Sequence, residues 1–330
     1  ELHAITSVAD GRLERAARGL KGRTTQHDVV RTIKAAGELP FAEGMALETK
    51  ISADSLLATE SLALRHVFFA ERECARIPDV AAPPAPMPVK NAAVIGAGTM
   101  GAGIAIALAD SGLPTTLIEV DQSGVERGLA GIRATYEASV KRGRLTAEDL
   151  AKRMALIKGA VGLESAANVD LVIEAVFEDM ALKKSILSTL DKVTPNHAVL
   201  ASNTSSLSVT ELGAATSRPD KVIGLHFFSP ANVMRLLEIV RGEQTSLETI
   251  ATGLSLGKTL RKVGVVVGDG FGFVGNRMML DGYFREAELM LLQGVAPERI
   301  DAVMEDFGFA MGPNRVNDMA GVDVGTKVRI

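Results

Sequence analysis

The chain has 330 residues, enough for two domains, and its 47% hydrophobic and 23% charged residues are typical of a folded globular protein. The net charge of −4 and the pI of about 5.9 argue against nucleic acid as the main partner, because nucleic-acid-binding proteins usually carry a basic surplus. A single cysteine, Cys74, excludes an internal disulfide and a multi-cysteine zinc site, and we expect no metal.

The first part of the chain predicts helices followed by a linker. Apolar residues recur with a spacing near 3.6 between residues 25 and 75, which is the period of an α-helix. The stretch "IPDVAAPPAPMPVKN" then contains five prolines, a composition typical of a linker. We place a domain boundary near residue 87, so residues 1–86 form a helical segment with its linker. The chain does not begin with methionine, and we expect it to be a fragment of a longer protein.

From residue 87 to residue 269, short apolar runs alternate with helix patterns. The strand candidates are "AAVIG", "TTLIEV", "VDLVIEAVF", "AVLASN", "VIGLHFF", "LLEIV" and "KVGVVVGD". A helix is expected over the whole of "TAEDLAKRMALI". After residue 269 the pattern becomes helical, and residues 270–330 predict an all-α domain. Strands that alternate with helices predict an α/β fold: a doubly wound, mostly parallel sheet of the Rossmann type, covered on both faces.

The uncharged run Ala92–Ala109 is near the minimum length of a membrane-spanning helix. It divides into a strand pattern, a glycine-rich turn and a helix pattern, so we predict no membrane span.

The stretch "VIGAGTMGAG" places Gly96, Gly98 and Gly101 in the spacing G-x-G-x-x-G between a buried strand and a helix. This context indicates a dinucleotide site, with a tight turn at the first glycine, close approach of pyrophosphate at the second, and helix packing at the third. Glu119, near the end of the next strand, can accept the ribose hydroxyls of NAD and would repel the extra phosphate of NADP. Asp121 is a rival for the same role.

Polar residues follow several predicted strands at their carboxyl ends, where open parallel sheets bind ligands. The run "FED", Phe177 to Asp179, follows the strand at Val176 and places Glu178 beside the expected cofactor crevice. Lys183, on the next helix, is interpreted either as a cofactor contact or as a solvated side chain. The run "ASNTSS" predicts either a plain turn or a substrate-binding loop.

The stretch "GLHFFSPANVMRLLEIVRG" carries His226 in one apolar run and Glu238 in the next. A buried histidine is often a plain core residue, and both groups are costly to bury unless they satisfy each other. If the two strands are neighbours, the carboxylate can bind one ring nitrogen and orient the other as a general base. Asn276, early in the helix after "GFGFVG", adds an amide suited to a substrate oxygen.

Together, "GAGTMGAGIA", "IEAVFEDMALKK", "SNTSSL", "HFFSPANVMRLLE", "GFVGNRM" and "FGFAMGP" resemble the L-3-hydroxyacyl-CoA dehydrogenases of fatty-acid β-oxidation. The resemblance runs from about Val89 to the end of the chain. "LPFAEGMALE" and "ALRHVFFAER" resemble the segment that joins enoyl-CoA hydratase to this dehydrogenase in multifunctional proteins. The two resemblances together imply NAD as cofactor, a 3-hydroxyacyl-CoA substrate, an upstream hydratase domain and a C-terminal helical domain that is truncated here.

The resemblance also implies roles for individual residues. His226 matches the catalytic base, Glu238 its carboxylate partner, and Ser205 and Asn276 groups close to the substrate oxygen. Ser229 departs from the asparagine of many single-function members and matches the multifunctional branch. The substrate contacts expected are Ser205, Ser229 and Asn276, and the cofactor contacts expected are Gly96, Gly98, Met100, Gly101, Glu119, Val176, Phe177, Glu178, Lys183 and Ser205.

Several alternatives stay open at this point. The chain is expected to be an NAD-dependent oxidoreductase without hydratase activity, and the alternative is an NAD-binding structural or regulatory protein that has lost turnover. The basic run 141–144, "KRGR", is interpreted either as a site for coenzyme A phosphates or as a solvated helix end. The resemblance allows a homo-oligomer or a thiolase partner. It favours a bacterial cytoplasm as the location, with a peroxisome as the alternative in a eukaryote.

Overall fold

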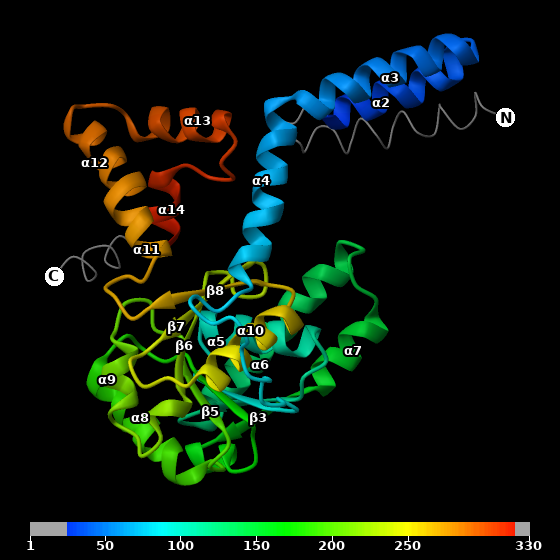
Figure 1. Ribbon diagram of the computed structural model, residues 1–330. Helices are drawn as coiled ribbons and strands as arrows, with labels where there is room; N and C mark the ends of the chain where they lie inside the picture. The colour runs from blue at the N-terminus through cyan, green and yellow to red at the C-terminus, as the bar shows by residue number, and fades with distance from the viewer. Residues whose placement is uncertain (1–24, 321–330) are drawn as a thin grey trace. The chain divides into compact units, whose positions relative to one another are not determined.

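The computed structural model describes residues 25–320, which divide into two compact units (Figure 1). One unit is continuous and runs from Glu73 to Met279. The other comprises the helices that precede and follow it in the chain. The candidate site lies within the continuous unit, which is therefore described first.

A single eight-stranded sheet forms the centre of the continuous unit, in the order β3-β2-β1-β4-β5-β6-β7-β8. All neighbouring strands are parallel except β6 and β7, so the last two strands run opposite to the first six. The order reverses between β1 and β4, which is where doubly wound sheets bind ligands. The strands are β1 (Ala92–Ile95), β2 (Thr115–Glu119), β3 (Ile157–Val161), β4 (Leu171–Glu174), β5 (Val199–Ser202), β6 (Val222–Phe227), β7 (Leu236–Arg241) and β8 (Val263–Gly268).

Helices cover both faces of this sheet, as the alternating pattern predicted. Buried side chains of α5, α6 and α10 pack on one face, and those of α8 and α9 pack on the other. The helices are α5 (Thr99–Asp110), α6 (Gln122–Lys141), α7 (Ala147–Ala155), α8 (Met180–Val193), α9 (Val209–Gly213) and α10 (Leu247–Thr259), with short 3₁₀ turns η1 (Leu163–Ala166) and η2 (Pro219–Lys221). The expected Rossmann-type architecture is confirmed.

The strand β3 was not predicted, because "ALI" was taken as the end of the preceding helix. Thr146 caps α7 as expected, with its hydroxyl accepting from the Asp149 N–H, but the helix ends at Ala155 and Ile157 begins the edge strand. Only Ile157 of this strand is fully buried, since an edge strand needs little apolar sequence. Gly159 permits close packing there, because a Cβ would lie 2.2 Å from Cγ1 of Val125.

The proline-rich stretch is not a free linker. Ile77 is 4% exposed and belongs to the core of the sheet, and Met87 and Val89 pack against the same core. The Met87 N–H also donates to Oγ1 of Thr252 at 2.9 Å. Composition alone suggested a spacer, whereas the apolar residues between the prolines attach this stretch to the domain.

The second unit is helical, as predicted. Its N-terminal part contains α2 (Thr25–Glu38), α3 (Phe41–Leu57) and α4 (Thr59–Cys74), whose last residues belong to the continuous unit. After β8 the chain forms α11 (Gly275–Met278), which still belongs to the continuous unit. It is followed by a π-helical turn η3 (Met279–Phe284), α12 (Arg285–Leu292), α13 (Pro297–Phe307) and α14 (Pro313–Ala320). None of the described helices is long and apolar enough to cross a bilayer. The parts of the terminal segments at 1–24 and 321–330 lie outside the described residues.

Candidate active site

The glycine-rich turn joins β1 to α5 beside the end of β4. Gly96 has a φ of +95°, in the left-handed region that favours glycine, and a Cβ there would lie 2.9 Å from the Ala175 carbonyl. At Gly101 a Cβ would lie 1.8 Å from the Gly96 carbonyl oxygen, so only glycine lets the first turn of α5 approach the strand. These two glycines are explained by the fold itself.

Gly98 is different, because nothing lies within 4 Å of the position that a Cβ would occupy. It is the N-cap of α5, and its backbone already has an extended conformation open to any residue. No hydrogen bond recorded among the described residues takes up the N–H groups of Thr99 or Met100 behind it. Free N–H groups at a helix N-terminus, with open space in front of them, fit the pyrophosphate of a dinucleotide.

Glu119 and Asp121 were rivals for the ribose, and the structure separates them. Asp121 is the N-cap of α6 and accepts from the Gly124 N–H at 2.7 Å, a bond that lowers the pKa of this carboxyl. Glu119 ends β2, and its Oε1 accepts from the Ala97 N–H in the glycine turn at 2.7 Å. Glu119 therefore lies beside the turn that would hold the cofactor, whereas Asp121 is occupied as a helix cap.

The alternative of a solvated Lys183 is wrong, because its side chain is only 1% exposed. Its Nζ lies 2.8 Å from Oε1 of Glu174, which is fully buried at the end of β4, and 3.4 Å from Oε2 of Glu178. The same amine reaches the Val176 carbonyl oxygen at 3.4 Å. Protein oxygens thus surround the Lys183 ammonium. Its expected contribution to NAD binding would therefore act through Glu178, which Lys183 holds in position.

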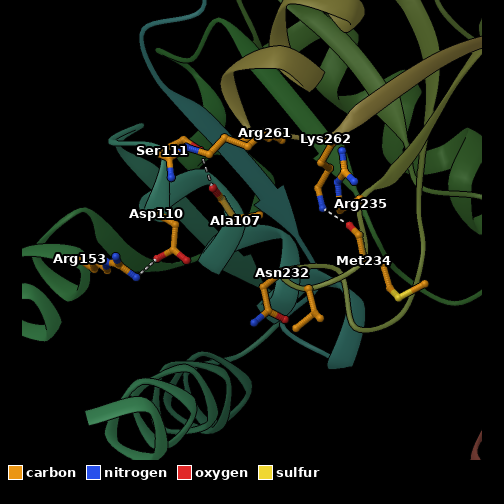
Figure 2. A pocket seen from close by; sticks show the side chains of 11 residues that line it. Ala107, Asp110, Ser111, Arg153, Asn232, Met234, Arg235, Arg261 and Lys262 are labelled. Atoms are coloured by element: carbon orange, nitrogen blue, oxygen red, sulfur yellow. Dashed lines mark hydrogen bonds and ion pairs between the residues drawn. The ribbon is translucent and has the colours of Figure 1, made fainter. Parts of the chain in front are cut away.

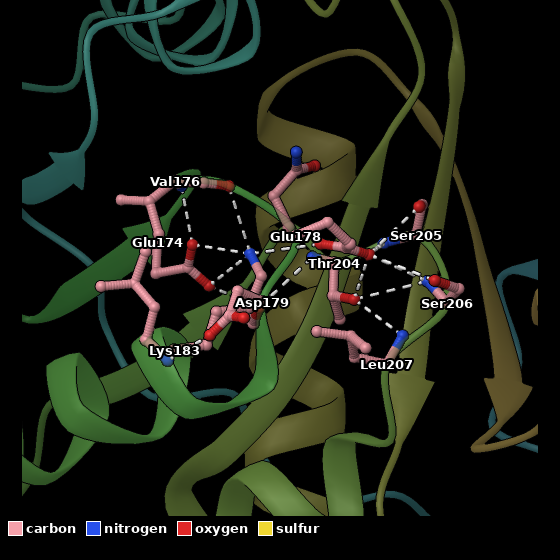
Figure 3. Close-up of polar contacts among 12 residues, drawn as sticks. Glu174, Val176, Glu178, Asp179, Lys183, Thr204, Ser205, Ser206 and Leu207 are labelled. Atoms are coloured by element: carbon pink, nitrogen blue, oxygen red, sulfur yellow. Dashed lines mark hydrogen bonds and ion pairs between the residues drawn. The ribbon is translucent and has the colours of Figure 1, made fainter. Parts of the chain in front are cut away.

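Glu178 connects this buried pair to the loop after β5. Its Oε1 accepts from the Thr204 hydroxyl at 2.7 Å and from the Ser205 N–H at 2.8 Å (Figure 3). Burial acts to raise the pKa of Glu178, but the Thr204 hydroxyl and the Lys183 ammonium outweigh it and hold that pKa below its usual value. The run "ASNTSS" is therefore a loop fixed by an ionised carboxylate beside the sheet's switch point.

His226 and Glu238 lie directly opposite each other on the antiparallel strands β6 and β7. Opposite residues of such a pair place their side chains on the same face, close enough to interact. Nδ1 of His226 lies 2.7 Å from Oε2 of Glu238, and the two side chains are 7% and 2% exposed. The aromatic rings of Phe228 and Phe273 lie 4.4 Å and 5.8 Å from the imidazole, measured between ring centroids.

The other oxygen of Glu238 is held by backbone that follows β8. Oε1 accepts from the Gly275 N–H at 2.7 Å and from the Val274 N–H at 3.1 Å. Burial acts to raise the pKa of Glu238, but the bonds from His226 and from these two N–H groups leave it below its usual value. An ionised carboxylate only accepts, so Nδ1 of His226 carries the proton and Nε2 has a free lone pair. No recorded hydrogen bond within residues 25–320 uses Nε2.

The remaining expected residues are distributed around this centre. Nδ2 of Asn276 donates to the Ser205 carbonyl at 3.2 Å, and the Ser205 hydroxyl lies 3.2 Å from Oε1 of Glu178. Ser229 is exposed in the loop after β6, and Met100 is half-buried against the core. Val176, just after β4, is half-buried. The phenyl ring of the next residue, Phe177, is 86% exposed, which is unusual because exposing so large an apolar side chain to water is unfavourable.

Two residues were missed at the sequence level. Glu174 anchors Lys183 and also accepts from the Ser202 hydroxyl at 2.7 Å. Asn203 accepts from the Phe227 N–H at 2.8 Å and so fixes the strand position next to His226. The signal for Glu174 was an acidic residue within a continuous apolar strand, since such a charge needs a buried partner. Asn203 gave no comparable signal, because asparagine after a strand usually indicates a turn.

Residues 91–270 match the family described as "3-hydroxyacyl-CoA dehydrogenase, NAD binding domain", and residues 272–330 match the C-terminal domain of the same family. The chain belongs to the 3-hydroxyacyl-CoA dehydrogenase family. NAD is therefore the cofactor of its Rossmann domain, in agreement with the open space at Gly98 and with Glu119 beside the turn.

Curated relatives extend the likeness over nearly the whole chain. The peroxisomal bifunctional enzymes of Danio rerio and Homo sapiens are 42% and 39% identical over 99% and 98% of this chain. The chain spans only 45% of the length of each. Among solved structures, (S)-3-hydroxybutyryl-CoA dehydrogenase from Ralstonia eutropha is 38% identical, with a TM-score of 0.69 over 73% of this chain and 86% of that one. The dehydrogenase part of multifunctional enzyme 1 from C. elegans is 29% identical, with a TM-score of 0.60 over 78% and 62%.

Proposed function

We propose that this chain catalyses the NAD-dependent oxidation of L-3-hydroxyacyl-CoA to 3-oxoacyl-CoA, and the reverse reduction, in fatty-acid β-oxidation. The observation that carries this proposal is the hydrogen bond between Nδ1 of His226 and Oε2 of Glu238 at 2.7 Å, in a chain of the 3-hydroxyacyl-CoA dehydrogenase family. A base with a free lone pair beside an NAD-binding crevice is what oxidation of an alcohol requires.

The residues divide the proton chemistry between them. Nε2 of His226 takes the proton of the 3-hydroxyl group, and in the reverse direction the imidazolium returns it to the carbonyl oxygen. Glu238 holds the ring through Nδ1 and stabilises the imidazolium charge as it forms. Bound NAD supplies the acceptor for the hydride that leaves C3 of the substrate. Phe228 and Phe273 keep water away from the ring, which strengthens its interaction with Glu238.

The substrate oxygen would be held by groups from two other segments. Asn276 already donates one amide hydrogen to the Ser205 carbonyl, which leaves the second for the substrate. The Ser205 hydroxyl is oriented by Glu178, the carboxylate that Lys183 holds. In this proposal the buried pair of Glu174 and Lys183 fixes the loop that positions the reacting oxygen.

The setting of the reaction is proposed on the same basis. The relatives are named bifunctional enzymes, and we propose an upstream hydratase domain in the complete protein. The family match over residues 91–270 supports sequence domain limits near 87 and 269, and the compact unit extends beyond both, from Glu73 to Met279. The relatives are also named peroxisomal, whereas the resemblance alone favoured a bacterial cytoplasm. A homo-oligomer and a thiolase partner stay predictions.

The test compares the two enantiomers of 3-hydroxybutyryl-CoA as substrates for NAD reduction. We expect turnover with the L enantiomer and none with the D enantiomer, and a strong preference for NAD over NADP because Glu119 repels the extra phosphate. NAD binding without turnover of either enantiomer would instead support the alternative of a binding protein without catalysis.

A further inference from the structure

A second concave site lies at the opposite end of α5 from the glycine turn (Figure 2). Its volume is about 240 Å³, and it is lined by the end of α5, by α7, by the loop before β7 and by the end of α10. Ala107, on its wall, follows Gly98 by nine residues of helix, or about 14 Å. This pocket is therefore separate from the site of the NAD pyrophosphate.

Four cationic side chains line this pocket, in a chain whose net charge is −4. They are Arg153, Arg235, Arg261 and Lys262, and Asp110 is the one acidic residue among the lining residues. Asp110 accepts from Nη1 of Arg153 at 2.8 Å and also from the Tyr136 hydroxyl at 2.9 Å. Asp110 thus belongs to Arg153 and Tyr136, and among the described residues no carboxylate pairs with Arg261 or Lys262. These two cations give the pocket a local positive charge, which favours an anionic ligand.

Lys262 is held at the rim by neutral groups. Its Nζ donates to the carbonyls of Ala231 and Met234, both at 2.7 Å. Burial lowers the pKa of its ammonium, with no carboxylate to oppose that effect. A bound anion would offset this desolvation, because it would favour the charged form of Lys262.

Arg261 stands in a backbone position that glycine usually occupies. Its φ is +56°, and the bond from the Lys262 N–H to the Gly257 carbonyl at 2.8 Å completes the left-handed cap of α10. A non-glycine residue in this conformation is strained, so the helix cap does not explain the arginine. The exposed guanidinium lines the pocket, where a strained residue is more readily explained by a ligand.

We propose that this pocket binds a phosphate-bearing anion through Arg261 and its cationic neighbours. Guanidinium groups bind phosphate oxygens in pairs, and the volume suits a phosphate with part of its parent molecule rather than a whole cofactor. One source is the nucleotide end of the coenzyme A substrate, which rests on the proposed function. Asn232 lies on the pocket wall, six residues after His226, so the backbone of these two residues is at most roughly 20 Å apart. The other source is a separate phosphorylated ligand.

The test is calorimetric titration of pyrophosphate with saturating NAD present, so that the glycine turn does not take up the probe. Arg261→Gly should weaken binding by roughly tenfold or more, because a charge-assisted bond is lost while the backbone gains its preferred residue. Arg261→Lys should retain part of the affinity. Lys192→Ala, which removes an exposed cation from α8 on the other face, should leave it unchanged. Equal affinity in the wild type and Arg261→Gly, or no binding at all, overturns the proposal.

The source is decided by comparing acetoacetyl-CoA with acetoacetyl-pantetheine, which lacks the phosphates. If coenzyme A is the ligand, Arg261→Gly raises KM for the first roughly tenfold and leaves KM for the second unchanged. If both KM values stay constant while pyrophosphate binding is lost, the ligand is a separate phosphorylated molecule. An equal rise of both KM values would mean that the residue acts on the fold of the loop and would contradict the proposal. The pyrophosphate titration needs no turnover, so it remains decisive even if the dehydrogenase assay fails.

Discussion

At the scale of single residues, Glu238 has a hydrogen-bond donor for each of its two carboxylate oxygens. It accepts from the His226 ring and from the N–H groups of Val274 and Gly275, so a carboxylate that is 2% exposed has three donors. A carboxylate buried at this level is stable only with such partners. Its position therefore depends on both strands of the β6–β7 pair and on the segment that follows β8.

The substitution Glu238→Gln should reduce kcat by about 10² to 10⁴, because an amide neither stabilises the imidazolium nor fixes the ring tautomer. The affinity for NAD should stay unchanged, since no bond to the glycine turn is altered. Steady-state kinetics of the reduction of acetoacetyl-CoA measure both. Glu211→Gln, on an exposed residue of α9 that pairs with Lys184, is the matched control. A kcat within roughly tenfold of the wild type would contradict the role of Glu238.

Acid should weaken the fold through the same carboxylate. The pKa of Glu238 is lower in the folded chain than its usual 4.5, so the unfolded chain binds its proton first as the pH falls. The stabilisation is fully present above the ordinary pKa and is lost as the pH falls through the lowered value. Urea unfolding at a series of pH values should show the wild type approaching the stability of Glu238→Gln in acid. A gap that widens as the pH falls would argue against an ionised Glu238.

At the scale of elements, the fold explains two glycines of the turn, Gly96 and Gly101, and we assign the third, Gly98, to the approach of the ligand. Gly98→Ala should change the free energy of unfolding by less than about 1 kcal/mol, because its φ of −67° suits alanine and nothing lies within 4 Å. It should weaken NAD binding by at least roughly tenfold, since the methyl group occupies the approach of the pyrophosphate. Isothermal titration and urea unfolding separate the two effects.

Gly101→Ala, in contrast, should lower the free energy of unfolding. A methyl group there would lie 1.8 Å from the Gly96 carbonyl oxygen, and backbone cannot yield as a side chain can. We expect destabilisation of about 3 kcal/mol or more, measured by the urea midpoint. Equal stability of the two alanine variants would mean that the turn differs from the one described.

The elements also show what a single sequence can and cannot predict. The helix α8 and the strands β6 and β7 follow from apolar spacing. The pairing of β6 with β7 was only a condition for a role of His226 and Glu238 together, and the structure meets that condition. β3 was missed because an edge strand of the composition "IKGAV" has almost no apolar pattern. Residues 77–91 were assigned as a spacer because proline dominates the composition, whereas Ile77 decides the packing.

At the scale of the molecule, the compact unit ends at Met279, ten residues after the expected boundary at 269. Those residues supply Phe273, which is 1% exposed in the core, and the two N–H groups on Glu238. A chain of residues 73–269 should therefore be less stable than one of residues 73–279 by about 3 kcal/mol or more, the usual cost of removing a buried phenyl ring. Thermal or urea unfolding of the two fragments measures this. Equal stability would show that the added segment is not part of the domain.

The site as a whole was predictable only in part, for physical reasons. For residues within a motif, such as Gly96 and Gly98, the spacing in the sequence is enough to predict a role in dinucleotide binding. The Glu174–Lys183 pair could not be predicted in this way, because it forms only when the end of β4 and the first turns of α8 meet inside the fold. Before the resemblance was considered, Lys183 could be a cofactor contact or a solvated side chain, and its burial excludes the second interpretation.

The most direct measurement is a single-turnover assay of NADH oxidation by acetoacetyl-CoA, with the wild type and His226→Gln each preloaded with NADH. The proton donor is lost in the variant while the fold and the glycine turn are kept, so the rate should fall by about 10² to 10⁴. Binding of NADH, measured separately, should be the same for both proteins. A rate within roughly tenfold of the wild type would show that another group moves the proton, and the assignment of the His226–Glu238 pair would be wrong.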